Sequence, residues 1–145
     1  MTGFGQHLMV DGYGGNCKKL ATLDLIYQFL DSYPEEIRMT KIMPPYVFKY
    51  HGTKPDDWGL SGVVLIAESH ISVHTFPKKR YLSVDIFSCK EFDAEHAVET
   101  IKKIFDLEKV EINLLERGQE FPKDLESAAD IVHQERLYKA GPVRV

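Results

Sequence analysis

Three strand-like segments follow one another directly in the middle of the chain, and this feature constrains the fold more than any other. Gly62–Ala67 is a continuous apolar run, typical of a buried strand. Ile71–Phe76 and Tyr81–Ser88 alternate apolar and polar residues, and the short Pro77–Arg80 connection predicts a hairpin between them. Consecutive strands joined in this way predict a mostly antiparallel sheet.

Helices and further strands are predicted on both sides of this region. A strand over His7–Val10 precedes a helix with apolar residues at three- and four-residue spacing, which Pro34 is expected to end. Asp93 is suited to cap a second helix. The other predicted segments are an extended stretch over Ile37–Tyr50, interrupted or placed at an edge by Pro44–Pro45, a polar loop over His51–Leu60, a strand over Val110–Leu114 and a helix over Asp124–Lys139.

The order of these elements predicts the fold class. The 145 residues fit one domain, residues 1–145, made of two strand-helix-strand halves. We expect an α+β protein, a two-layer α/β sandwich with helices on one face of a mostly antiparallel sheet. The second face of such a sheet is either wet or covered by a partner.

Charge and cysteine content narrow the classes of partner and compartment. The net charge of −4 gives no general attraction to nucleic acid or anionic membranes. No apolar run approaches the roughly 20 residues of a membrane span, and the N-terminus lacks the pattern of a secretory signal. Cys17 and Cys89 are better read as two reduced thiols of a cytoplasmic protein than as a disulfide.

The two faces of the predicted hairpin differ in chemistry. Alternation puts Ile71, Val73, Leu82, Val84 and Ile86 on an aliphatic face that should meet the helices. The opposite face collects residues that can carry chemistry, which are His70, Ser72, His74, Ser83, Asp85 and Cys89.

Two common kinds of site fit this face poorly. His70 and His74 lie roughly 13 Å apart on a strand, whereas zinc ligands sit about 2.0–2.3 Å from the ion, so no metal is expected. A serine hydrolase site at Ser69 would lack the G-x-S-x-G elbow, because Ala67 and Ile71 occupy the glycine positions.

The combination of residues resembles a known family. The segment Leu60–Cys89 closely resembles the small prokaryotic S-adenosylmethionine decarboxylases, which are pyruvoyl enzymes of polyamine synthesis. The resemblance is carried by SGVVLI from Ser61, ESH from Glu68, HTFP from His74 and DIFSC from Asp85. Weaker similarity includes His7-Leu8 and Glu116-Arg117-Gly118.

The resemblance implies a proenzyme that cleaves itself between Glu68 and Ser69, into residues 1–68 and 69–145. Ser69 Oγ would attack the carbonyl carbon of Glu68, and loss of the Ser69 α-proton from the resulting ester would release the Glu68 carboxylate. The dehydroalanine left behind would hydrolyse to a pyruvoyl group and ammonia. His74 matches the processing base and Ser61 a serine near the bond. Since Ser69 and His74 have opposite parity, we expect the chain to bend near Ser69.

The resemblance also implies the catalytic roles. The pyruvoyl group would form a Schiff base with the α-amine of S-adenosylmethionine and accept the electrons left by carbon dioxide. Cys89 matches the cysteine that returns a proton to the α-carbon. Phe76 matches an aromatic residue that stacks on adenine, with Tyr46 or Phe48 as its expected partner. The product would be the aminopropyl donor for spermidine and other polyamines.

Two positions depart from the family pattern. Many members carry an acidic residue where this chain has Lys78, and a small residue where it has Arg80. The acid accepts hydrogen bonds from the ribose hydroxyls of the substrate, whereas lysine has three donors and no acceptor. Lys78–Arg80 is therefore either a solvated hairpin tip or the mark of a changed substrate.

Three functions follow from these observations. The first is a pyruvoyl-dependent decarboxylase of S-adenosylmethionine. The second is a pyruvoyl-dependent decarboxylase of another amino acid, such as arginine or ornithine. The third is a non-enzymatic α/β ligand-binding module. By resemblance we expect a homodimer that uses the polar sheet face or a sheet edge, with no nucleic-acid or membrane partner.

Overall fold

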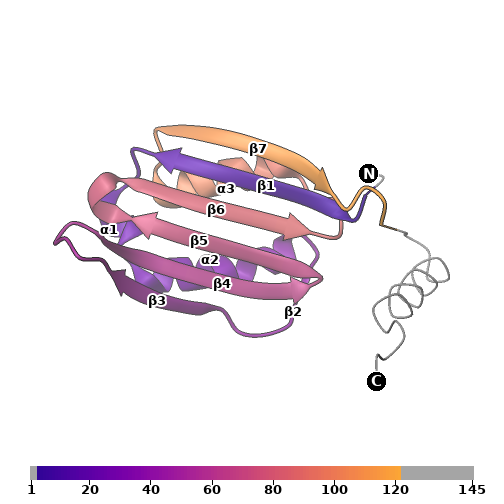
Figure 1. Ribbon diagram of the computed structural model, residues 1–145, viewed down its shortest axis with the longest axis horizontal. Helices are drawn as coiled ribbons and strands as arrows, with labels where there is room; N and C mark the ends of the chain where they lie inside the picture. The colour runs from indigo at the N-terminus through magenta and orange to yellow at the C-terminus, as the bar shows by residue number, and fades with distance from the viewer. Residues whose placement is uncertain (1–2, 122–145) are drawn as a thin grey trace, which may run out of the picture.

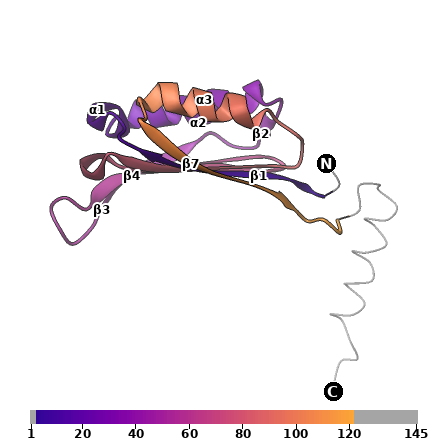
Figure 2. The same ribbon diagram turned by 90° about the horizontal axis from the view of Figure 1, so that it is seen from above.

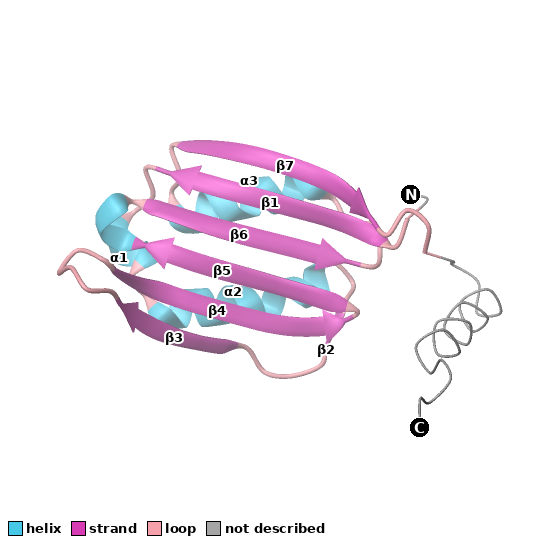
Figure 3. Ribbon diagram, viewed as in Figure 1, coloured by secondary structure: helices cyan, strands magenta, loops and turns pink. Residues whose placement is uncertain are grey.

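The computed structural model describes residues 3–121, which form a seven-stranded antiparallel sheet with its helices on one face (Figure 1, Figure 2). This is the α+β sandwich that the sequence predicts, while the helix predicted over Asp124–Lys139 lies outside the described residues. The strand order is β2-β4-β5-β6-β1-β7, and β3 also pairs with β4. The elements are β1 (Gly5–Tyr13), α1 (Cys17–Leu20), α2 (Leu23–Glu36), β2 (Thr40–Lys41), β3 (Tyr46–His51), β4 (Trp58–Ala67), β5 (Ser69–Phe76), the 3-10 turn η1 (Pro77–Lys79), β6 (Tyr81–Ser88), α3 (Ala94–Phe105) and β7 (Lys109–Arg117), as Figure 3 shows.

The helix side of the sheet holds the hydrophobic core. α2 packs against β4 and β3, and α3 packs against β1. The aliphatic face predicted by alternation is confirmed, because Ile71, Val73, Leu82, Val84 and Ile86 are all at most 1% exposed. In the described residues, no helix is long and apolar enough to cross a membrane.

The tight β5–β6 connection is confirmed as a hairpin turn. η1 leads into Arg80, whose φ of 53° is left-handed. The Arg80 side chain donates hydrogen bonds to the carbonyl oxygens of Gly15 at 2.9 Å and Gly14 at 3.0 Å. These contacts tie the turn to the end of β1, so Arg80 has a structural role in this fold.

A second hairpin joins β4 to β5 at the predicted cleavage point. Ile66 pairs with Ser69, which leaves Ala67 and Glu68 as a two-residue turn. The Ala67–Glu68 peptide bond is cis. Ser69 has a φ of 133°, a value that residues other than glycine rarely adopt. The bend expected near Ser69 is therefore present, although the sequence did not predict that it reverses the chain.

Two predicted boundaries in the first half of the chain are wrong. The single helix expected to end at Pro34 is two helices, and α2 continues through Pro34 to Glu36. A proline in the last turn removes only one intrahelical hydrogen bond. Tyr33 and Pro34 are both buried, so packing against the core outweighs that loss.

The polar loop is shorter than predicted. β4 begins at Trp58, which pairs with His51, so only residues 52–57 connect the two strands. At the start of β4, Gly59 allows a close approach to β5, because a Cβ at that position would lie 1.8 Å from the carbonyl oxygen of Thr75. The interruption predicted at Pro44–Pro45 is confirmed, since these two residues separate the two-residue β2 from β3.

Candidate active site

Cys89 contacts the β4–β5 turn in two directions. Its backbone N–H donates to the carbonyl oxygen of Glu68 at 3.3 Å, and the N–H of Glu68 donates to Cys89 Sγ at 3.4 Å. The pairing of Ser69 with Ser88 explains this contact, since Cys89 is the next residue along the chain. The structure thus brings Cys89, just after β6, next to Glu68 and Ser69 at the β4–β5 turn.

Strand alternation had predicted Cys89 on the polar face, and this prediction is wrong. β6 ends at Ser88, so alternation no longer decides the direction of the next side chain. Cys89 is partly buried and packs against the hydrophobic core. Its sulfur is therefore reachable from the turn, on a side chain that is only partly buried.

A second group of predicted residues lies at the other end of β5. Ser61 and His74 are directly opposite each other in the β4–β5 register. Ser61 Oγ and His74 Nδ1 are 2.9 Å apart, a hydrogen-bond distance, and His74 is exposed. This pairing of two residues thirteen positions apart comes from the register that the two-residue turn sets.

The two groups do not meet within one chain. Ser69 and His74 are five residues apart on β5, which corresponds to roughly 16 Å along an extended strand. His74 cannot reach the α-proton of Ser69 in the same chain across that distance. The structure therefore divides the predicted processing residues into a turn cluster, which is Glu68, Ser69 and Cys89, and a histidine pair, which is Ser61 and His74.

The predicted substrate-binding aromatics surround the histidine pair. Tyr46 and Phe48 are 64% and 51% exposed, and their rings lie edge to face at 5.5 Å. Phe76 is two residues beyond His74 on the same strand, and its ring lies 5.5 Å from that of Tyr81. A hollow of about 270 Å³ is lined by Tyr46, Phe48, Ser61, Gly62, Val63, Ser72 and His74.

Three basic residues follow Phe76 at the hairpin tip. Lys78 is exposed. The Lys79 ammonium lies 5.9 Å from the centre of the Phe76 ring. Arg80 is engaged with the Gly14 and Gly15 carbonyls and also lies 3.5 Å from a Glu108 carboxylate oxygen. Lys78 is therefore an exposed residue two positions after Phe76 in the sequence.

The open face also adds His7 to His70 and Asp85, which strand alternation had placed on this face without it. His7 Nε2 lies 3.6 Å from Asp85 Oδ1, and the His70 ring meets Phe87 edge to face at 5.8 Å. Burial lowers the pKa of His70, and the neighbouring His7 lowers it further. The cluster depends on pairing between β1 and β6, which are far apart in the sequence, and the only signal was the weaker similarity at His7-Leu8.

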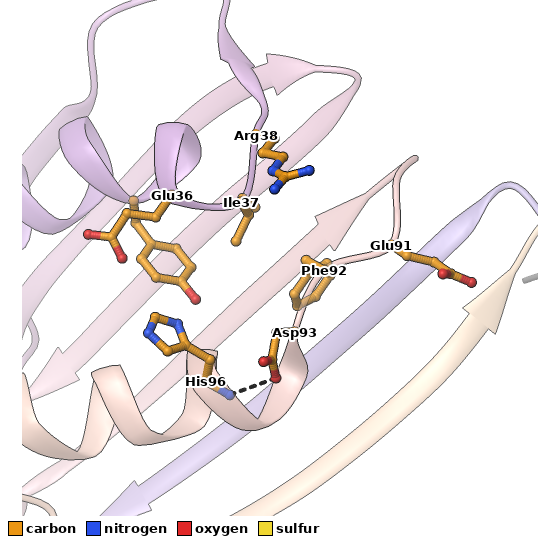
Figure 4. Close-up of a pocket in the computed structure, with 8 residues that line it drawn as sticks. Glu36, Ile37, Arg38, Glu91, Phe92, Asp93 and His96 are labelled. Atoms are coloured by element: carbon orange, nitrogen blue, oxygen red, sulfur yellow. Dashed lines mark hydrogen bonds between the residues drawn. The ribbon is translucent and has the colours of Figure 1, made fainter.

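A separate cavity of about 260 Å³ lies between the end of α2 and the start of α3 (Figure 4). Tyr33 is one of the residues that line it, and its hydroxyl is buried and without a hydrogen-bond partner among the described residues. Burial raises the pKa of this hydroxyl, with smaller contributions from Glu36 and Asp93. The cavity contains none of the predicted site residues, and no group of three potential metal ligands occurs within residues 3–121.

Comparison with known proteins fits this geometry. A family model described as S-adenosylmethionine decarboxylase matches residues 6–118. The chain belongs to the S-adenosylmethionine decarboxylase family. The S-adenosylmethionine decarboxylase proenzyme of Clostridium botulinum (strain Langeland) is 34% identical over 116 residues, which cover 79% of this chain and 95% of the relative.

A longer match and a solved structure support the same family. The S-adenosylmethionine decarboxylase proenzyme of Pyrococcus abyssi is 31% identical over 138 residues, covering 94% of this chain and 95% of the relative. The crystal structure of the adenosylmethionine decarboxylase from Aquifex aeolicus VF5 has a TM-score of 0.66 and 28% identity. That match covers 81% of this chain and 93% of the other.

Proposed function

We propose that this family member is a self-processing decarboxylase of S-adenosylmethionine whose pyruvoyl group derives from Ser69. The observation that carries the proposal is the contact of Cys89 with both backbone groups of Glu68, at the bond to be cleaved. Relatives named as proenzymes support a processing step. The product would serve as an aminopropyl donor for polyamines, and the free thiols of Cys17 and Cys89 fit the reducing cytoplasm.

The turn cluster can assist cleavage through its backbone. Negative charge develops on the Glu68 carbonyl oxygen when Ser69 Oγ attacks the carbonyl carbon. The Cys89 N–H already points at that oxygen and stabilises the charge without needing to reorient. The unusual φ of Ser69 further supports a turn that changes conformation when the bond breaks.

The same residues fit a pyruvoyl group at position 69. Such a group supplies an electron sink for loss of carbon dioxide. Cys89 Sγ lies beside the turn, partly buried, where it can hold a proton near the reacting α-carbon. Phe76, Tyr46 and Phe48 offer ring faces for the adenine of the substrate.

A homodimer would complete the site. The histidine pair lies near the opposite end of β5 from the turn cluster, and the face between them is not covered by helices (Figure 2). A two-fold axis crossing β5 near Ser72 would bring the Ser61–His74 pair of one copy over the Glu68–Ser69 turn of the other. Exposed apolar residues on that face, including Leu65 and Leu115, favour its burial against a second copy.

Denaturing mass spectrometry tests the processing step. The wild-type chain should give fragments 1–68 and 69–145, and Ser69→Ala should remain intact. Cys89→Ser should still be cleaved but lose about 100-fold or more in turnover, the usual contribution of a general acid. Cys17→Ser, which changes the other free thiol, should match the wild type in both measurements. A wild-type chain that stays intact would contradict the proposal.

A second candidate function is decarboxylation of another amino acid. The observation that favours it is Lys78, whose exposed ammonium cannot accept hydrogen bonds from a ribose. The pyruvoyl chemistry itself requires only an α-amino acid. The aromatic residues beside Lys78 favour S-adenosylmethionine over a purely aliphatic substrate, so we keep it as the first candidate.

Release of carbon dioxide from carboxyl-labelled substrates separates the two candidates. If S-adenosylmethionine is the substrate, it should be decarboxylated faster than arginine or ornithine. Lys78→Glu should then raise kcat/KM for S-adenosylmethionine about tenfold, since a hydrogen bond to a charged group contributes about 1.5–3 kcal/mol. Lys79→Glu is the matched control and should change kcat/KM for S-adenosylmethionine less. No release from S-adenosylmethionine would leave the second candidate.

A further inference from the structure

Arg117 is a cation at the end of the sheet where the turn cluster lies. β5 and β1 begin at this end, and β6 and β7 end there (Figure 1). Arg117 is the last residue of β7 and is paired with Gly5 of β1. Because glycine has no side chain, no side chain of β1 separates Arg117 from β6 at this position. Arg117 also belongs to the Glu116-Arg117-Gly118 segment of family similarity, which has no role in the proposed processing and decarboxylation.

The guanidinium of Arg117 reaches across β1 to β6. Its central carbon lies 4.1 Å from the centre of the Phe87 ring. Phe87 is opposite His70 in the β5–β6 register and comes two residues before Cys89. Paired strands lie about 4.8 Å apart, and residues along one strand about 3.3 Å apart. The guanidinium is therefore held beside the turn cluster on the open face.

The positive charge of Arg117 is not neutralised by the protein. No carboxylate of the described residues forms an ion pair with it, and Asp85 lies instead 3.6 Å from His7. Burial is the largest cause of the lowered pKa of His70, and the charge of Arg117 also contributes. An exposed cation–π contact contributes little by itself, so the Phe87 ring orients the guanidinium without balancing its charge.

Aromatic side chains surround the ring on which Arg117 stacks. Phe4 packs against Phe87, with ring centres 5.6 Å apart, and meets Phe121 edge to face at 4.9 Å. The Phe4 N–H donates to the Arg117 carbonyl oxygen at 2.8 Å, so this aromatic group lies directly beside β7. Apolar neighbours displace water and strengthen the attraction of the guanidinium for an anion. The fixed fork of guanidinium donors is suited to a carboxylate, which it binds through two parallel hydrogen bonds.

The substrate of the proposed reaction brings a carboxylate to this place. Its α-amine would react at residue 69, and its α-carboxylate is bonded to the same carbon as that amine. The carboxylate must therefore lie close to the turn cluster when the amine is in position. Holding it in one orientation also favours its loss, because the breaking bond has to be aligned with the electron acceptor.

We propose that Arg117 binds the α-carboxylate of the substrate on the open face, beside residue 69. This role rests on the proposed decarboxylase function, but it applies to each candidate substrate, because S-adenosylmethionine, arginine and ornithine all carry an α-carboxylate. Arg117 forms and breaks no covalent bond. Its guanidinium holds the carboxylate until carbon dioxide leaves, and the product amine, which lacks that group, does not make this contact.

Comparison of substrate with product tests this role. Arg117→Met removes the charge and keeps an apolar side chain for the Phe87 ring. In the cleaved enzyme it should raise KM about tenfold or more, the effect of losing a hydrogen bond to a charged group. A comparable fall in kcat is not expected, because the carboxylate loses its charge in the transition state. The inhibition constant of the decarboxylated product should stay unchanged, and Arg117→Lys should give an intermediate KM.

Lys109→Met is the matched control at the other end of β7. The Lys109 ammonium lies 5.8 Å from the centre of the Tyr13 ring, so the substitution removes a similar contact of the same strand away from the turn cluster. It should change neither KM nor the inhibition constant of the product.

Three results would overturn the role of Arg117 while leaving the proposed function intact. The first is an unchanged KM in Arg117→Met. The second is an equal loss of affinity for substrate and product, which would indicate a structural role. The third is failure of Arg117→Met to cleave itself into fragments 1–68 and 69–145, which would place its action before the substrate binds. A wild-type enzyme that releases no carbon dioxide from any of the three amino acids would overturn the proposed function and this role together.

Discussion

His70 is held on the open face in surroundings that disfavour its charged form. Burial is the larger cause of its lowered pKa, and repulsion from His7 and Arg117 opposes the attraction of Asp85. The pKa of the folded protein is therefore below the roughly 6.5 of an unfolded chain. As pH falls, the unfolded chain binds this proton first, so the stability contributed by neutral His70 is full above about 6.5 and is lost below it.

The lowered pKa of His70 predicts how the free energy of unfolding changes at acidic pH. In the uncleaved Ser69→Ala background, the free energy of unfolding should decrease as pH falls below about 6.5, and His70→Gln should make that decrease shallower. His51→Gln, at the exposed end of β3, is the matched control and should keep the slope. Urea unfolding at several pH values measures this slope of the free energy of unfolding against pH. An unchanged slope in His70→Gln would contradict the assignment.

Single residues also show which conclusions come from the family resemblance and which come only from contacts in the structure. The motif residues identified Ser69 and Cys89, but only the two hydrogen bonds to Glu68 relate them to one bond. Arg80 is the reverse case. It departs from the family pattern, yet its contacts with Gly14 and Gly15 explain it as an anchor of the turn.

At the scale of elements, Thr75 joins β5 to two neighbours inside the core. Its hydroxyl donates to the Leu20 carbonyl at the end of α1, at 2.7 Å, and accepts from the Leu60 N–H of β4, at 3.1 Å. Thr75 is 1% exposed. Loss of the hydroxyl would leave two backbone groups buried without their partner.

Thr75→Val should therefore destabilise the protein although it keeps the shape of the side chain. We expect a loss of about 2 kcal/mol or more, because an unsatisfied buried polar group costs about 1–3 kcal/mol. Thr75→Ser keeps the hydroxyl, loses one methyl and should cost about 1 kcal/mol. Denaturant midpoints at constant m-value measure both. If Ser proved worse than Val, packing of the methyl would be the larger effect.

The elements themselves were largely predictable because their signals are local. Alternation gave β5 and β6 and the faces they bury, and Asp93 caps α3 by accepting from the His96 N–H at 3.0 Å. The error at Pro34 arose where burial outweighed local preference. The error at Trp58 arose because strand pairing with β3 extends β4 back to that residue. Local signals also do not reveal that β4 and β5 form a hairpin, because Ala67-Glu68 is not a characteristic turn sequence.

At the scale of the whole molecule, the separation of the turn cluster from the histidine pair predicts that two chains share each site. Ser69→Ala and His74→Ala should each fail to process alone. Coexpressed, they form mixed dimers in which one site combines Ser69 of the His74→Ala chain with His74 of the Ser69→Ala chain. That site should be cleaved, and mass spectrometry should find fragments of the His74→Ala chain only.

The control for this experiment is a pair that cannot complement. Coexpression of Ser69→Ala with a double Ser69→Ala, His74→Ala chain leaves no chain with a cleavable bond and should yield no fragments. If His74→Ala were cleaved when expressed alone, His74 would not be required for processing. If no cleavage appeared in the mixture, the two-chain site would be wrong.

The sequence by itself determined the class of fold, the two faces of the hairpin and the residues that resemble a processing site. It did so because side-chain periodicity and motif spacing are properties of neighbouring residues. Only the tertiary structure decided which of those residues meet. Alternation specifies a face but not a register, and the two-residue turn at Ala67-Glu68 sets the register that pairs Ser61 with His74. The same register keeps His74 at the far end of β5 from Ser69, because a strand is extended and rigid over that length.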